Sequence, residues 1–324
     1  MKSIKRVLFI SLIIASLVLS ACSGDNEKTA KKQEVILGTA GTAGTYYVVG
    51  AAMGKEISQN SELIEVVVQS TNGSMENINL VNSGEIQFGM SNSDGVYHAY
   101  NGVGTYADIG KQNIKGLMSL YMSAGQMVVK ESSKIDSFVD LKGKKVCLGP
   151  PSTTIIEMSK AILRESGIDP ENDIQAFYLS FDEGLTKLTD GDIDATFFVA
   201  GTPTAALMNA ASTQSLKLLS VDDDVLEAIV SEHPYFEPHI IKGGTYKGMD
   251  EDVQTLKLMT NIFVKGDLEE DIVYEYVKQA MENLEAYKGA HVSAAEISIE
   301  EVYKTPIELH PGAERYYREV GVIK

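Results

Sequence analysis

Cysteine is scarce in this sequence, which has only Cys22 and Cys147 among its 324 residues. Cys22 directly follows a predicted signal segment, so Cys147 is the single cysteine in the body of the protein. An intramolecular disulfide within that body is therefore excluded. The apolar neighbours of Cys147, at positions 146 and 148, predict a buried strand in which the thiol acts as a small, inert hydrophobic group.

Basic residues are also few, and arginine is the rarest of them. Lysine and arginine total 28 against 45 acidic residues, which gives a formal net charge of −17 at pH 7. This negative charge argues against nucleic acid as a partner. Beyond Arg6, the arginines are Arg164, Arg315 and Arg318, all on segments predicted to be surface or C-terminal helix. We therefore expect an anionic ligand to be held by backbone N–H groups, hydroxyls and amides.

Motifs of catalysis are missing from the sequence. The five histidines show no zinc-ligand spacing, no Gly-x-Ser-x-Gly motif occurs, and no Gly-Lys-Ser/Thr follows the glycine-rich turn. The remaining enzymatic alternative is a nucleophilic pair of Cys147 with a distant histidine. The apolar strand predicted around Cys147 favours an unreactive thiol instead. We expect the protein not to be an enzyme, and we expect neither a cofactor nor a metal ion.

The N-terminus has the pattern of a bacterial lipoprotein signal. Basic residues precede the apolar residues 7–19, which are too few to span a bilayer but fit the central region of a secretory signal. Residues 19–22, Leu-Ser-Ala-Cys, resemble a lipobox, so we expect residues 1–21 to be removed and Cys22 to be diacylated. The alternative is an ordinary signal with a chance cysteine. With Cys22 diacylated, the polar residues 22–33 would be a flexible tether that holds the body at the outer face of the cytoplasmic membrane.

Predicted strands and helices alternate along the rest of the chain, which indicates an α/β architecture with largely parallel sheets. One example is the helix predicted from residue 46, whose apolar positions 46, 49, 53 and 57 share one face. About 290 residues follow the tether, more than one core usually supports, so two lobes are expected. We assign residues 34–122 and 265–324 to lobe I and residues 123–264 to lobe II, with hinges near residues 122–125 and 265–267.

Two small-residue loops between a strand and a helix predict an anion-binding site. Residues 38–45 read Gly-Thr-Ala-Gly-Thr-Ala-Gly-Thr, and residues 149–154 occupy the equivalent place in the second half. A helix beginning in such a loop presents free N–H groups and the positive end of its dipole. Two such helix ends across a cleft could hold a small acid. Polar residues at other junctions, 71–77, 91–94 and 201–203, support a shared site, although each is also an ordinary helix cap or turn.

Several ordered motifs resemble one known family. They are Gly44-Thr45-Tyr46-Tyr47, Thr71-Asn72-Gly73-Ser74-x-x-Asn77, Ser93-Asp94, Gly191-Asp192-Ile193-Asp194-Ala195, Gly201-Thr202-Pro203, Gly244-Thr245-Tyr246 and His310-Pro311-Gly312-Ala313. From about residue 34 onward the chain resembles the TAXI proteins, the TRAP-associated extracytoplasmic immunogenic receptors of tripartite ATP-independent transporters. The resemblance implies a two-lobed periplasmic-binding-protein fold of type II. It departs at Thr153, where the family commonly has glycine.

The resemblance implies a monomeric receptor that delivers a small carboxylate or amino acid, such as glutamate, glutamine or a dicarboxylate, to a TRAP membrane permease. The alternative is a type II binding protein that serves an ATP-driven importer. We expect one group of polar and small loop residues to donate hydrogen bonds, to fix polar groups of the ligand, or to lie next to residues that do so. These residues are Gly44, Thr45, Asn72, Ser74, Asn77, Asn92, Ser93, Ser152, Thr153, Thr154, Gly201 and Thr202. Tyr46, Tyr47 and Phe198 would cover apolar ligand surface, with core packing as the alternative for the tyrosines. Asp94 could receive an ammonium group, or cap a helix.

Overall fold

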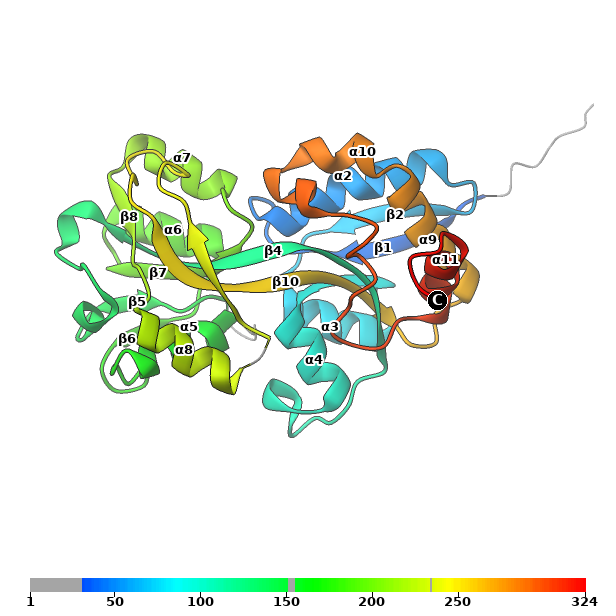
Figure 1. The fold of residues 1–324 in the computed structure, drawn as a ribbon. Helices are drawn as coiled ribbons and strands as arrows, with labels where there is room; N and C mark the ends of the chain where they lie inside the picture. Colours follow the sequence, from blue (N-terminus) through cyan, green and yellow to red (C-terminus); the bar gives the residue numbers. More distant parts are fainter. Residues whose placement is uncertain (1–30, 151–154, 234) are drawn as a thin grey trace, which may run out of the picture. The chain divides into compact units, whose positions relative to one another are not determined.

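The computed structural model describes residues 31–150, 155–233 and 235–324. Residues 33–324 make up one unit, and its elements are labelled in Figure 1. Its strands belong to a ten-stranded mixed sheet with the order β2-β1-β3-β10-β4-β7-β5-β6, in which β8 pairs with β4 and β9 with β10. No helix in the described ranges combines the length and the apolar character needed to cross a membrane.

The first part of the unit alternates strands and helices as predicted. Its elements are β1 (Gln33–Gly38), α2 (Thr45–Asn60), β2 (Ile64–Gln69), α3 (Ser74–Ser83), β3 (Phe88–Asn92), α4 (Ser93–Asn101) and the short η1 (Gly104–Tyr106). β1 lies between β2 and β3 and is parallel to both. The apolar stripe of α2 packs inward as its spacing predicts, since Val49, Met53 and Ile57 are fully buried. All of β3 is buried.

Two long strands, β4 (Ile114–Lys130) and β10 (Val253–Lys265), run antiparallel to each other through the middle of the sheet (Figure 1). The sequence pattern predicted separate strands at 116–120 and 127–130, which was wrong, because β4 is continuous and almost wholly buried. Residues 114–124 of β4 pair with β10, residues 124–129 pair with β7, and residues 128–130 pair with β8. A register shift in β10 lies between Met259 and Asn261. Between those two predicted strands, the buried Ser123 Oγ forms a hydrogen bond of 2.8 Å with Thr260 Oγ1 of β10.

The second part of the unit repeats the alternation. Its elements are η2 (Glu131–Ser133), η3 (Phe138–Leu141), β5 (Lys145–Cys147), α5 (Ile155–Glu165), β6 (Gln175–Phe177), α6 (Phe181–Asp190), β7 (Ala195–Ala200), α7 (Ala205–Thr213), β8 (Leu216–Leu218), α8 (Asp223–Glu232) and β9 (Glu237–Ile241). β5 lies between β6 and β7 and is parallel to both. Cys147 is 1 % exposed at the end of β5, so the prediction of a buried, free thiol is confirmed.

The C-terminal segment packs against the first part of the chain. Its elements are α9 (Glu270–Glu282), α10 (Leu284–Tyr287), η4 (Lys288–Ala290), η5 (Val292–Glu296) and α11 (Pro311–Glu319). The prediction of one helix over residues 268–287 was wrong, because it breaks at Asn283, whose φ of −108° and ψ of 16° depart from the helix. His310 caps α11 by accepting a hydrogen bond from the Gly312 N–H at 3.2 Å.

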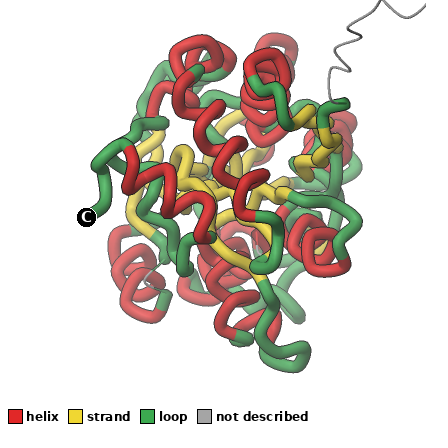
Figure 2. Tube along the Cα trace, turned by 90° about the vertical axis from the view of Figure 1, so that its right-hand side faces the viewer, coloured by secondary structure: helices red, strands yellow, loops and turns green. Residues whose placement is uncertain are grey.

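Helices lie around the outside of the strands in the tube view (Figure 2). The buried apolar residues beneath them fall into clusters that follow the chain. Two clusters draw only on residues 35–121 and 262–323, and two others only on residues 124–258. Within β10 the change of cluster lies between Leu258 and Ile262. The lobe limits at residues 122 and 265 stay a prediction.

Candidate functional site

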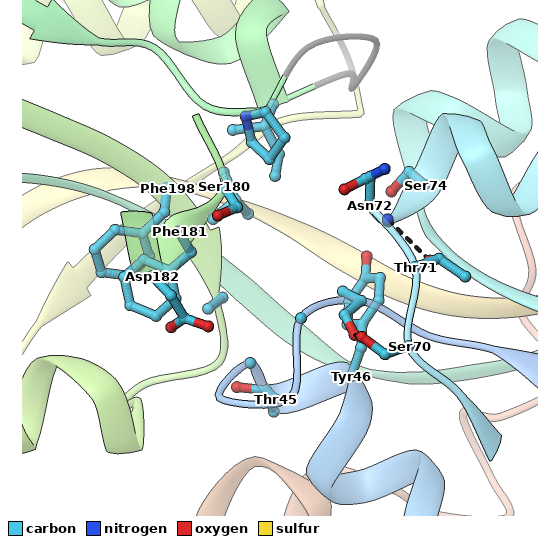
Figure 3. A pocket seen from close by; sticks show the side chains of 18 of the residues that line it. Thr45, Tyr46, Ser70, Thr71, Asn72, Ser74, Ser180, Phe181, Asp182 and Phe198 are labelled. Atoms are coloured by element: carbon cyan, nitrogen blue, oxygen red, sulfur yellow. Dashed lines mark hydrogen bonds between the residues drawn. The ribbon is translucent and has the colours of Figure 1, made fainter. Parts of the chain in front are cut away.

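A cavity of about 240 Å³ lies where several strand-to-helix junctions meet (Figure 3). This volume suits a small metabolite rather than a peptide or a nucleotide. The residues that line it are Ala40, Gly41, Gly44, Thr45, Tyr46, Ser70, Thr71, Asn72, Gly73, Ser74, Asn92, Pro150, Ile155, Ser180, Phe181, Asp182, Phe198, Val199 and Ala200. They come from both parts of the chain, so the cavity depends on the long strands that join those parts.

Two helix N-termini open onto the cavity, those of α2 and α3. Their N-cap residues are Gly44 and Gly73, and no side chain in the described part of the chain caps either helix. Glycine offers no side-chain acceptor, so the first N–H groups of these helices stay available to a ligand. The backbone at Gly73, with φ of 99° and ψ of −150°, is one that only glycine adopts without strain.

The loop that precedes α3 is held rigidly by Asn77 and Thr71. Asn77 is fully buried and donates to the carbonyls of Thr39 and Met90 at 2.7 and 2.8 Å. Its Oδ1 accepts the Thr71 hydroxyl at 2.7 Å, and Thr71 Oγ1 accepts the Gly73 N–H at 3.0 Å (Figure 3). Asn77 therefore supports the cavity wall from behind. The side-chain amide of Asn72, by contrast, has no hydrogen bond to any described residue and faces the cavity.

Tyr46 contributes to the cavity wall through its ring and is anchored by its hydroxyl. Its OH donates to Asn92 Oδ1 at 2.6 Å, and both residues are buried. Burial raises the pKa of Tyr46 far above its ordinary value, so the group is a neutral donor across the physiological range. The Asn92 N–H in turn donates to Ser74 Oγ at 3.3 Å. The ends of α2, α3 and α4 are thus connected beside the cavity.

The opposite wall is formed by the start of α6 and by β7. Ser180, Phe181, Asp182 and Phe198 lie across the open space from Thr71, Asn72 and Ser74 (Figure 3). Ser180 and Glu183 form a capping box, in which Ser180 Oγ accepts the Glu183 N–H and the Glu183 carboxylate accepts the Ser180 N–H at 3.1 Å. This box satisfies the N–H groups of Ser180 and Glu183 within the fold. Partial burial, together with the neighbouring Glu183, raises the pKa of the Asp182 carboxyl above its ordinary value.

The cavity brings together part of the predicted site. The predicted residues that line it are Gly44, Thr45, Tyr46, Asn72, Ser74, Asn92 and Phe198. Those that the structure places outside the lining are Tyr47, Asn77, Ser93, Asp94, Gly201 and Thr202. Asp94 is fully buried, and its Oδ1 accepts the Gly95 N–H at 2.7 Å. Gly201 lies just behind the lining, where its carbonyl accepts the Thr45 hydroxyl at 3.5 Å. Cys22, Ser152, Thr153 and Thr154 lie outside the described residues.

Sequence reasoning missed most of the wall around α6. The pattern Ser180-x-x-Glu183 is a capping box and could have located the start of that helix. It could not have shown that Phe181 and Asp182 face a cavity, because that depends on how the second part of the chain packs against the first. No arginine is among the described residues that line the cavity. Arg315 pairs with Glu270 and Asp271 at 2.8 and 3.0 Å, away from the cavity lining.

Comparison with known proteins identifies the family. A model of the NMT1-like family matches residues 37–321, nearly the whole described chain. The chain belongs to the NMT1-like family. Solved structures with similar folds include the alkanesulfonate-binding protein SsuA from Xanthomonas axonopodis pv. citri bound to MOPS. It has 13% sequence identity and a TM-score of 0.51, and the match covers 89% of this chain and 84% of that one.

A second similar structure is a binding protein component of an ABC phosphonate transporter from Pseudomonas aeruginosa. It is 10% identical, with a TM-score of 0.51, and the match covers 81% of this chain and 79% of that one. At such identities the likeness concerns the fold. It confirms the prediction of an α/β fold of the type II periplasmic-binding-protein class.

The assignment to the TAXI receptors of TRAP transporters is corrected by these findings. The family that matches is the NMT1-like family, and the similar solved structures are substrate-binding proteins such as SsuA and an ABC-transporter component. The motifs that carried the resemblance are helix caps and turns at strand ends, which related folds share for local structural reasons. What the comparisons show is membership of the NMT1-like family and the fold of a type II periplasmic-binding protein.

Proposed function

We propose that this member of the NMT1-like family is the solute receptor of an ATP-driven importer. The receptor would bind one small solute in the cavity between α2, α3 and α6 and release it to the membrane subunits. The observation that carries the proposal is the cavity itself, which is built from strand ends and from two glycine-capped helix N-termini. The ABC phosphonate transporter component of similar fold supports the importer type.

The cavity suggests how one end of the solute is held. The free N–H groups at the start of α2 and α3 favour a hydrogen-bond-accepting group, such as a carboxylate, at this wall. The Asn72 amide and the Ser74 hydroxyl lie beside those N–H groups and would add donors. The Thr45 hydroxyl would join them by leaving the Gly201 carbonyl, to which it donates at the long distance of 3.5 Å. Ser152 and Thr154, expected to act with them, stay a prediction. The ring of Tyr46 would cover apolar ligand surface.

Calorimetry on single variants tests the wall. Asn72→Ala removes an amide that supports no described part of the fold, so its unfolding midpoint should match that of the parent protein. Its affinity for the solute should fall by about two- to tenfold, which corresponds to one hydrogen bond. Asn209→Ala, on the exposed face of α7, is the matched control and should leave the affinity unchanged. Equal affinity in both variants would contradict the proposed orientation.

Binding itself is tested by a thermal-shift screen of carboxylates, sulfonates, phosphonates and amino acids, because a ligand specific to the folded state raises the apparent stability. The importer type is tested genetically. An adjacent ATPase gene whose deletion abolishes uptake of the solute would support it, and uptake that persists without the ATPase would refute it.

We also propose that the protein is anchored by a diacyl group on Cys22. The anchor would keep the receptor near its transporter, with residues 22–33 as the tether. Metabolic labelling with palmitate should mark the parent protein and not Cys22→Ala. Label in the variant would refute the anchor and leave the solute-binding proposal untouched.

A further inference from the structure

The described lining of the cavity has one formal charge, and that charge is negative. Of the described residues that line it, only Asp182 bears a formal charge at neutral pH, and no lysine, arginine or histidine is among them. The whole chain has a formal net charge of −17, so its long-range field also favours cations over anions. A purely anionic solute would meet repulsion on entering this site.

Asp182 differs from the other acidic residue of the same helical turn. The Glu183 carboxylate is used inside the fold, where it accepts the Ser180 hydroxyl at 2.8 Å. The Asp182 carboxylate has no hydrogen bond or ion pair with any residue in the described ranges, although it lines the cavity. A Cβ placed on Gly41 would lie 3.7 Å from Asp182 Oδ2, so the carboxylate reaches across toward the loop before α2. Asp182 is an exposed residue at the rim of this wall, so its carboxylate is open to a ligand.

Two aromatic rings accompany this carboxylate. Phe181 precedes Asp182 in the chain, Phe198 belongs to β7, and their ring centroids are 3.9 Å apart. Both rings line the cavity on the side of Asp182 (Figure 3). Ring faces attract cations, including the ammonium groups of ligands. The wall formed by the start of α6 and by β7, across from the starts of α2 and α3, therefore combines a carboxylate with aromatic surface.

We propose that Asp182, with Phe181 and Phe198, forms a subsite for an organic cation, so that the solute carries an ammonium or related group at one end. This inference rests on the proposed function, in which one end of the solute lies at the starts of α2 and α3. The ammonium group would be at the other end of the same solute. Asp94, the acid singled out from the sequence, is buried behind the lining at the start of α4. Asp182 is thus the residue that selects amines over their neutral or anionic analogues.

The test compares matched ligand pairs on the purified protein by isothermal titration calorimetry and thermal shift. Each pair differs only by an ammonium group in place of a hydroxyl: L-glutamate and 2-hydroxyglutarate, L-leucine and 2-hydroxyisocaproate, 4-aminobutyrate and 4-hydroxybutyrate. In at least one pair the amine should bind at least about tenfold more tightly, as expected for a charge-assisted interaction. Asp182→Asn should abolish this preference. Phe181→Leu should weaken the amine about two- to fivefold.

Asp190→Asn is the matched control, because Asp190 lies at the other end of α6, away from the cavity lining, and should keep the parent preference. Hydroxyl analogues that bind as tightly as the amines, or an Asp182→Asn protein that keeps the preference, would overturn the subsite and leave the proposed receptor function standing. An Asp182→Asn protein with a lower ligand-free unfolding midpoint and unchanged affinities would also overturn it, since the carboxylate would then serve the fold. Absence of binding in every pair and throughout the wider screen would refute both proposals.

Discussion

The hydroxyl of Tyr46 offers a sharp test of how the cavity wall is held together. The Tyr46→Phe variant keeps the ring that lines the cavity and removes only the oxygen that donates to Asn92 Oδ1 at 2.6 Å. Tyr46 is 8 % exposed and Asn92 is 2 % exposed, so water cannot freely replace the lost donor. The variant therefore leaves a buried amide oxygen without its partner, and we expect it to destabilise the fold while keeping the shape of the site.

The size of the effect follows from this burial. Removing one partner of a buried hydrogen bond costs about 1–3 kcal/mol in the free energy of unfolding, because the remaining group is desolvated without compensation. Because burial raises the pKa of Tyr46, the hydroxyl stays protonated throughout the neutral range. The loss should accordingly be the same at about pH 6 and about pH 9, both well below the ordinary tyrosine pKa.

Urea denaturation of the purified protein measures the loss, and Tyr47→Phe is the matched control. Tyr47 is the next residue of α2, is only half-buried and has no hydrogen bond from its hydroxyl to another described residue. The control should stay within about 0.5 kcal/mol of the parent protein. If Tyr46→Phe were as stable as Tyr47→Phe, the wall would not depend on the Tyr46–Asn92 bond, and the argument from burial would fail.

Three further predictions concern packing, backbone and pH. Gly201→Ala would place a Cβ 2.3 Å from Ser293 Oγ, so urea denaturation should show a free energy of unfolding that is lower by about 1–3 kcal/mol. Gly289→Ala, with open space around the added Cβ, is the control. Equal losses of stability in the two variants would contradict the steric reason. Gly73→Ala should cost a similar amount because φ is 99°, and an unchanged midpoint would show that the backbone relaxes. Burial lowers the pKa of His98, so the unfolded chain binds the proton more readily and the free energy of unfolding should fall as pH drops from about 7.5 to about 5.5. His98→Gln should reduce this slope, and equal slopes would refute the assignment.

Local patterns in the sequence predicted most of the elements. The stripe of apolar residues in α2 and the small-residue loop before it located that helix to within one residue, because burial of one face and the caps at its start are local properties. The pattern failed where tertiary pairing overrides local signals. Strands were predicted separately at 116–120 and 127–130, yet β4 continues between them, where Thr260 on the neighbouring strand satisfies the buried Ser123 hydroxyl. Helix α7 was missed because its sequence, AALMNAAST, has no clear cap or polar face.

The residues of the candidate site were likewise only partly predictable from the sequence. Thr45, Asn72 and Ser74 could be singled out because they follow predicted strands and begin predicted helices, a placement that sequence order alone reveals. Asp182 could not, since an acid in the first turn of a helix is usually a solvated partner of the helix dipole.

By itself, the sequence determined the alternation of strands and helices, the negative charge, the scarcity of arginine and the small-residue loops, because each depends on residues close together in the chain. Only the tertiary structure decided which loop ends share a cavity. The antiparallel pairing of β4 with β10 and of β4 with β7 brings residues 180–200 opposite residues 40–74. That pairing depends on contacts between distant segments, so no local pattern could have placed Asp182 across from the starts of α2 and α3.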